Sequence, residues 1–337
     1  MTVIGPPSPP PRGARTNSVT AGAGKLRVSR LGAPAAPGLL AQLARIEEDF
    51  DVRAKKVAEA TTRLHTTADN EAVHDLRVAL RRLNAALRMW RDLLRPRAGR
   101  RSRRQLRDLR RALGPVRELE VDVARLAQLS REVPPESRVA LEGLLLGLHQ
   151  RLDRRRRRAA RAADSHTMER LARSVARATD ALRLRPGHLP EPQLVARVHI
   201  DQARERALAA LTDGLQSNDD DRLHAGRVAL KKWRYAIETA SALFDPGVPL
   251  EPLRDLQKVL GDVHDLAMLR DRLERRAEKL RAANMTSHAA ALDPAFASLH
   301  AERERGVERA HELATRLVET TPGEGSLALA PRPTQNP

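Results

Sequence analysis

The chain has 337 residues, and its 61 Lys and Arg against 43 Asp and Glu give a formal net charge of +18. This excess predicts a polyanionic partner such as nucleic acid, an acidic membrane surface or a polyphosphate. Cysteine is absent, which excludes disulfides, thiolate metal sites and cysteine nucleophiles and fits a cytoplasmic protein. No apolar run is long enough for a transmembrane helix, so we expect no membrane insertion.

Composition divides the chain into three parts. Residues 1–37 are rich in Pro, Gly, Ala and Ser and lack apolar periodicity, so they are predicted to form a disordered tail. Residues 321–337 are predicted to be disordered on the same grounds. Between them, residues 38–320 are predicted to fold, with a proline-rich break that separates a first half (38–190) from a second half (191–320).

The folded part is predicted to be all-α and built from antiparallel helical hairpins. Ala, Leu, Arg and Glu favour helices, and the alternating pattern of strands is missing. We expect Gly114 and Pro115 to end a helix. The predicted helices cover 39–62, 71–94, 100–113, 116–131, 136–163 and 168–184, then 193–215, 221–244, 253–260, 263–283 and 289–318.

Two sequence motifs occur twice. Residues 73–83 read VHDLRVALRRL, and residues 223–233, which lie 150 positions later, read LHAGRVALKKW. Residues 106–119 read LRDLRRALGPVREL, and residues 253–266, 147 positions later, read LRDLQKVLGDVHDL. Two motifs in the same order at nearly the same spacing predict an internal duplication, and therefore two pseudo-symmetric helical bundles.

The first motif combines an apolar stripe with a cationic flank. Apolar residues from Val73 to Leu94 recur at spacings of three and four, so one side of this helix is expected to face a core. At about 100° per residue, His74, Arg77 and Arg81 lie beside this stripe rather than opposite it. Their counterparts in the second copy are His224, Arg227 and Lys231. A solvated face is one interpretation of any charge run, but the repetition in both halves favours an anion-binding surface.

The arginine-rich segments extend this basic character. Between residues 77 and 111 there are 14 arginines and only two acidic residues, Asp92 and Asp108, so this hairpin cannot neutralise itself. The run Arg154–Arg158 is a weaker signal, because five successive helical residues point in every direction and at most two or three serve one surface. We interpret the run as auxiliary electrostatic attraction, with a solvated face as the alternative.

The histidines and carboxylates do not predict a metal site or a catalytic centre. No two of the 11 His have the spacing of three or four that helical metal ligands need, and the cations beside His74 and His224 would repel a metal ion. We therefore expect no metal and no cofactor, and we interpret these two His as donors to an anion. Glu118, Asp122, Asp265 and Asp271 are interpreted as ion-pair partners of nearby arginines or as acids placed favourably at helix N-termini. The alternative roles, as Mg²⁺ ligands or catalytic groups, have less support because no phosphate-binding loop or hydrolase motif is present.

Across residues 39–318, the two pairs of motifs resemble those of the CHAD family, the conserved-histidine α-helical domain. The resemblance implies two helical bundles around a basic central channel, binding of inorganic polyphosphate and association with polyphosphate granules. It implies polyphosphate-binding roles, with Tyr235 adjacent, for His74, Arg77, Arg81, Arg82, Arg107, Arg111, His224, Arg227, Lys231, Lys232, Arg234, Arg254 and Lys258.

The two copies also depart from each other. Asn84 stands where the second copy has Arg234, and Arg117 stands where it has His264, so we expect the two halves to hold a bound chain unequally. Many relatives carry an N-terminal CYTH domain of the triphosphate-hydrolase type. Residues 1–37 are too short for one, so catalysis by that route is not expected.

Three functions are therefore compared. The leading hypothesis is non-catalytic polyphosphate binding in the cytoplasm, with the chain associated with granules. The alternative is a nucleic-acid-binding protein that uses the same basic surface, but the 2% aromatic content provides few residues for base stacking. The third is an enzyme that acts on phosphate chains, which lacks a supporting motif.

Overall fold

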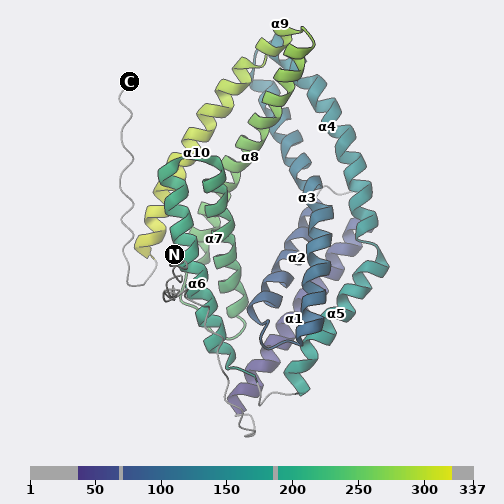
Figure 1. Ribbon diagram of the computed structural model, residues 1–337, viewed down its shortest axis with the longest axis vertical. Helices are drawn as coiled ribbons and strands as arrows, with labels where there is room; N and C mark the ends of the chain where they lie inside the picture. Colours follow the sequence, from purple (N-terminus) through teal and green to yellow (C-terminus); the bar gives the residue numbers. More distant parts are fainter. Residues whose placement is uncertain (1–36, 68–70, 185–188, 321–337) are drawn as a thin grey trace, which may run out of the picture. The chain divides into compact units, whose positions relative to one another are not determined.

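The computed structural model describes residues 37–67, 71–184 and 189–320, and the regular elements in these ranges are all α-helices (Figure 1). The predicted all-α class is therefore confirmed. The predicted tails lie outside the described residues, except for Pro37. The domain boundaries, the duplication and the central channel stay predictions.

The helices pack as successive hairpins, and all of the described residues belong to one unit. α1 packs on α2, α3 on α4 and α5, α6 on α7, and α8 on α10. No helix in the described ranges is long and apolar enough to cross a lipid bilayer. The helices are α1 (Pro37–Thr66), α2 (Glu71–Met89), α3 (Pro96–Glu132), α4 (Pro135–Ala162), α5 (Ser165–Leu184), α6 (Pro192–Ser217), α7 (Asp220–Ala240), α8 (Leu250–Ala282), α9 (Thr286–Ala290) and α10 (Asp293–Thr320).

Two predicted helix breaks are wrong. α3 runs without interruption through Gly114 and Pro115, and α8 runs through the equivalent Leu260-Gly261. A proline inside a helix removes one backbone hydrogen bond and costs about 3 kcal/mol. The packing of α3 on its neighbours outweighs this cost, since Leu113 and Val116 on either side of Gly114 and Pro115 are fully buried.

The predicted apolar stripe of α2 forms part of the core. Leu76, Leu80, Leu83 and Leu87 are each at most 1% exposed, and Trp90 just beyond the helix is fully buried. Fully burying one such side chain stabilises the fold by about 1.5–3 kcal/mol. Because this stripe fixes the rotation of α2, the histidine and arginines on its flank are held at the edge of the core, half-buried.

Helices at corresponding positions of the two halves contact one another. The contacts join α1 with α6, α2 with α7, α3 with α8, and α4 with α10. A twofold relation between two similar halves would produce such a pattern. For function the α2–α7 contact matters most, because these helices carry the two copies of the cationic flank.

Glycines allow α6 and α7 to approach closely. A Cβ atom on Gly214 would lie 2.8 Å from the Arg222 carbonyl oxygen and 3.0 Å from the Leu223 Cα. A Cβ atom on Gly226 would lie 3.1 Å from the Ala210 carbonyl oxygen. Position 226 corresponds to Leu76 in the first copy, so this close approach explains why the second copy has no side chain there.

We expect Gly214→Ala to lower the free energy of unfolding by about 1–3 kcal/mol, because backbone atoms of α7 must move to admit the methyl group. Gly143→Ala is the matched control, since the space around Gly143 in α4 is open. There the alanine should raise the free energy of unfolding by up to about 1 kcal/mol. Denaturant unfolding of both variants measures whether each free energy of unfolding rises or falls. A Gly214→Ala variant more stable than the unchanged protein would contradict the close contact between α6 and α7.

Candidate anion-binding site

Five basic side chains from three helices converge where the halves meet. We call them the central cluster: Arg77 and Arg81 of α2, Arg110 of α3, and Arg227 and Lys231 of α7. After burial, the positive charge of Arg81 contributes to lowering the pKa of each of the other four. Because a Coulomb interaction of this kind requires proximity, α2 and α7 present their cations to one shared region.

The charge of the central cluster is poorly neutralised. Burial, followed by Arg227 and Arg81, lowers the pKa of Lys231 to about 7. Burial and Arg81 lower the pKa of Arg77 to about 10. Within the described residues, none of the five cations forms an ion pair with a carboxylate. The Nε atoms of Arg81 and Arg227 are buried and have no hydrogen-bond partner. Buried donors without acceptors are costly, so an anion that supplies acceptor oxygens would stabilise this region.

The repeated Leu-Gly motif makes room for two of these guanidinium groups. A Cβ atom on Gly114 of α3 would lie 3.4 Å from the Arg77 Nη1. A Cβ atom on Gly261 of α8 would lie 3.3 Å from the Arg227 Nη2. The two pairs occupy equivalent positions in the repeat. Each glycine therefore accommodates the arginine of the neighbouring motif inside a continuous helix and does not end the helix.

The two halves differ around their histidines. In the second half, His224 and His264 place their Nδ1 atoms 3.1 Å apart, with ring centroids 4.0 Å apart. One ring must donate and the other accept in this pair, so both cannot carry the proton at Nδ1. Burial, then His224, Arg227 and Lys231, lowers the pKa of His264 to about 4. In the first half, Arg117 replaces His264, and after burial it lowers the pKa of His74.

Carboxylates follow the cluster on α3 and α8. Burial raises the pKa of Asp265, which lies near enough to Arg227 and Lys231 to feel their charges. Burial also raises the pKa of Asp122 to about 6, although its oxygen lies 2.5 Å from the Arg272 guanidinium. Asp271 forms an ion pair with Arg270 at 3.5 Å. In the described part of the chain, these and other acidic or histidine side chains form no group of three that would hold a metal ion.

Three further residues of the predicted site lie on α2 and α7 next to members of the central cluster in the sequence or near Glu238. The Nε of Arg82 donates to the Glu238 carboxylate at 3.3 Å, and the Nε of Arg234 lies 3.6 Å from the same carboxylate. The Arg234 guanidinium also stacks over the Tyr235 ring at 4.8 Å, and Tyr235 itself is buried. Glu238 thus partly neutralises both arginines, which makes them less attractive to an anion than the five cations of the central cluster.

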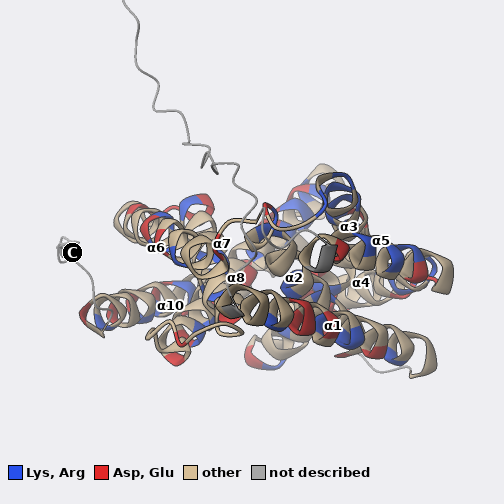
Figure 2. Ribbon diagram, turned by 90° about the horizontal axis from the view of Figure 1, so that it is seen from below, with Lys and Arg blue, Asp and Glu red and all other residues tan. Residues whose placement is uncertain are grey.

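The remaining predicted residues lie outside the central cluster and have exposed side chains, as Arg110 of the cluster also has. They are Arg107, Arg111, Lys232, Arg254 and Lys258. Sequence reasoning chose Arg107 and Arg111 but missed Arg110, which belongs to the cluster. The usable signal was Gly114: Arg110 lies four residues before this glycine and therefore on the same face of α3. Figure 2 shows that α3 carries many basic residues, so its sequence alone does not single out Arg110.

The fold and the cluster together define an all-α protein with a basic, incompletely neutralised centre. The model of the CHAD domain matches residues 48–274, and the chain belongs to the CHAD family. This confirms the resemblance drawn from the repeated motifs. No curated protein sequence matches the chain.

Two solved structures share the fold. The crystal structure of the CHAD domain from the plant Ricinus communis has a TM-score of 0.60 and 19% sequence identity, covering 87% of this chain and 97% of that chain. PptA from Streptomyces chartreusis has a TM-score of 0.58 and 23% identity, covering 85% of this chain and 100% of that chain. At these identities the likeness concerns the fold.

Proposed function

We propose that the protein binds inorganic polyphosphate at the central cluster without transforming it. The observation that carries this proposal is the gathering of five cations that have no carboxylate partner among the described residues, with the pKa of Lys231 lowered to about 7. Polyphosphate places a negative charge and acceptor oxygens at every unit of a flexible chain. Arginine binds such oxygens in pairs and lysine as a point charge.

Family membership supports the same ligand, because the resemblance to CHAD proteins implies polyphosphate binding and association with granules. We accordingly propose a cytoplasmic protein that reaches polyphosphate granules through this site. His74 and His224 flank the cluster, and their lowered pKa values leave them neutral at pH 7, with an N–H available to donate to a phosphate oxygen.

Nucleic acid is the alternative ligand, and the aromatic residues argue against it. Base stacking needs exposed aromatic rings. Here Phe50, Trp90, Trp233 and Tyr235 are buried. Phe244, whose ring lies under the Arg197 guanidinium at 4.9 Å, and Phe296 are half-buried. None of the six aromatic rings is fully exposed, which favours a polyanion lacking bases.

Direct comparison of ligands tests the proposal. Affinities of the full chain for long-chain polyphosphate, duplex DNA and heparin should be measured at the same salt concentration and the same concentration of anionic groups. We expect polyphosphate to bind at least about tenfold more tightly than either competitor, with affinity falling steeply as salt rises. We also expect no release of orthophosphate in the presence of Mg²⁺. Displacement of polyphosphate by an equal phosphate concentration of DNA would overturn the assignment.

A further inference from the structure

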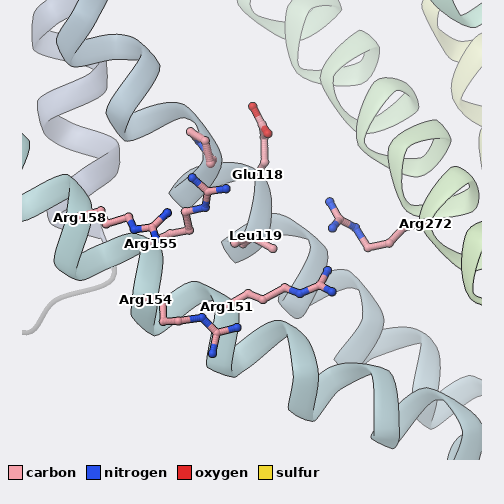
Figure 3. A pocket seen from close by; sticks show the side chains of 8 residues that line it. Glu118, Leu119, Arg151, Arg154, Arg155, Arg158 and Arg272 are labelled. Carbon is pink, nitrogen blue, oxygen red and sulfur yellow. The ribbon is translucent and has the colours of Figure 1, made fainter.

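A basic pocket lies between α3, α4 and α8, and none of its lining residues belongs to the central cluster (Figure 3). Its volume is about 370 Å³, within the range of small-ligand sites. Pro115, Glu118 and Leu119 of α3 form one wall, and Arg272 reaches in from α8. The opposite wall is formed by four arginines of α4: Arg151, Arg154, Arg155 and Arg158.

The spacing of the four α4 arginines explains why they share this pocket. Positions 151, 154, 155 and 158 are separated by three, one and three residues, which places them on one face of a helix. Three members of the five-arginine run therefore line the pocket, which agrees with the expectation that at most three serve one surface. Arg156 points elsewhere and donates to Glu120 at 3.2 Å.

The pocket holds a surplus of positive charge. Its lining contains five arginines and one carboxylate, Glu118. Arg272 is already paired with Asp122 at 2.5 Å, whereas the four α4 arginines form no ion pair within the described residues. Like charges three and four residues apart destabilise a helix, so an anion in the pocket would relieve repulsion along α4.

We propose that this pocket is a second anion site, which takes a short phosphoanhydride chain of a few units. This inference rests on the proposed function, because the occupant is either a second stretch of the polyphosphate held at the central cluster or free tripolyphosphate. The pocket and the central cluster have no lining residue in common. Glu118 lines the pocket and also acts electrostatically on Arg77, while Asp122 feels the charges of Glu118 and Asp265. These carboxylates lie near both groups of cations and would repel an anion placed beside them.

A matched pair of variants on one helix tests the second site. Arg154→Gln with Arg158→Gln removes two pocket cations, and Arg157→Gln with Arg161→Gln removes two exposed cations of α4 that do not line the pocket. Both pairs have the same spacing and the same change in net charge. Isothermal titration of the full chain with tripolyphosphate at low salt should show two sites in the unchanged protein and in the second pair, and one site in the first. Unaltered thermal unfolding would show that all of them are folded.

Long-chain polyphosphate distinguishes the two sources of the occupant. If the same polyphosphate spans both sites, the pocket pair should weaken its binding by about tenfold, and the exposed pair by much less. An effect on tripolyphosphate alone would assign the pocket to short free chains. Equal behaviour of the two pairs with both ligands would overturn the second site and leave the central one intact. Absence of all binding by the unchanged protein would overturn the proposed function as well.

Discussion

Removal of four central charges is expected to weaken polyphosphate binding roughly 10⁴-fold, since each charged hydrogen bond contributes about 1.5 kcal/mol. The variant combines Arg77→Ala, Arg81→Ala, Arg227→Ala and Lys231→Ala. The slope of log affinity against log salt should fall by roughly 3, because four phosphate contacts no longer release counterions. Titration of labelled polyphosphate across a range of salt concentrations measures both quantities.

The same variant is expected to be more stable than the unchanged protein in the absence of ligand. Burial and mutual repulsion lower the pKa values of Arg77, Arg227 and Lys231, which means that the folded state holds these charges at a cost. Their removal should raise the free energy of unfolding by about 0.5–2 kcal/mol, as is common where a functional site opposes stability. Weaker polyphosphate binding together with a higher free energy of unfolding would indicate that these charges serve ligand binding and not stability.

A charge-matched variant separates the cluster from net charge. Its changes are Arg107→Ala, Arg111→Ala, Arg254→Ala and Lys258→Ala, all at exposed positions of the predicted site. We expect about a tenfold loss of affinity and a free energy of unfolding within about 0.5 kcal/mol of the original. If both variants lost the same affinity, the convergence of the central cluster would have no special part in binding.

The cationic flank of the repeated helix could be predicted from the sequence, because burial of the apolar residues determines the orientation of the helix. The apolar spacing from Val73 onward fixes which side of α2 faces the core, and the neighbouring position of Arg77 and Arg81 follows from helix geometry alone. The same reasoning placed Arg227 and Lys231 on α7. Packing confirms the stripe: Leu76, for example, is fully buried.

The errors arose where a local signal had a non-local cause. Gly114 and Gly261 resemble helix ends in sequence, but each makes space for an arginine that comes from another helix. Glu238 partly neutralises both Arg82 and Arg234. Helical spacing could not predict its contact with Arg82, because the two residues are 156 positions apart in the sequence. The pocket face of α4 is visible in the spacing of its arginines, but Arg272, which completes it, comes from the other half of the chain.

Polyphosphate affinity is expected to fall roughly 50-fold between pH 7 and pH 9, because Lys231 must regain its proton to bind. Its pKa is lowered to about 7 in the free protein, and a phosphate beside it should return the pKa toward the ordinary value near 10.4. Binding at pH 8 should therefore take up close to one proton per site. Calorimetry in buffers of different ionisation enthalpy measures this uptake directly.

Lys231→Arg is the control, since arginine keeps its charge across this pH range. Its affinity should change little between pH 7 and pH 9, and its proton uptake at pH 8 should be near zero. His224 and His264 do not produce the same dependence, because their pKa values lie below 6.5.

The lowered pKa of Lys231 also determines how the stability of the free protein changes with pH. Between pH 7 and about 10.4 the unfolded chain binds the Lys231 proton and the folded chain does not, so the free protein gains stability from this residue as pH rises. Equal pH dependence in the two proteins would show that Lys231 keeps its proton without a ligand, and that the cations of α2 and α7 do not converge as closely as the structure places them.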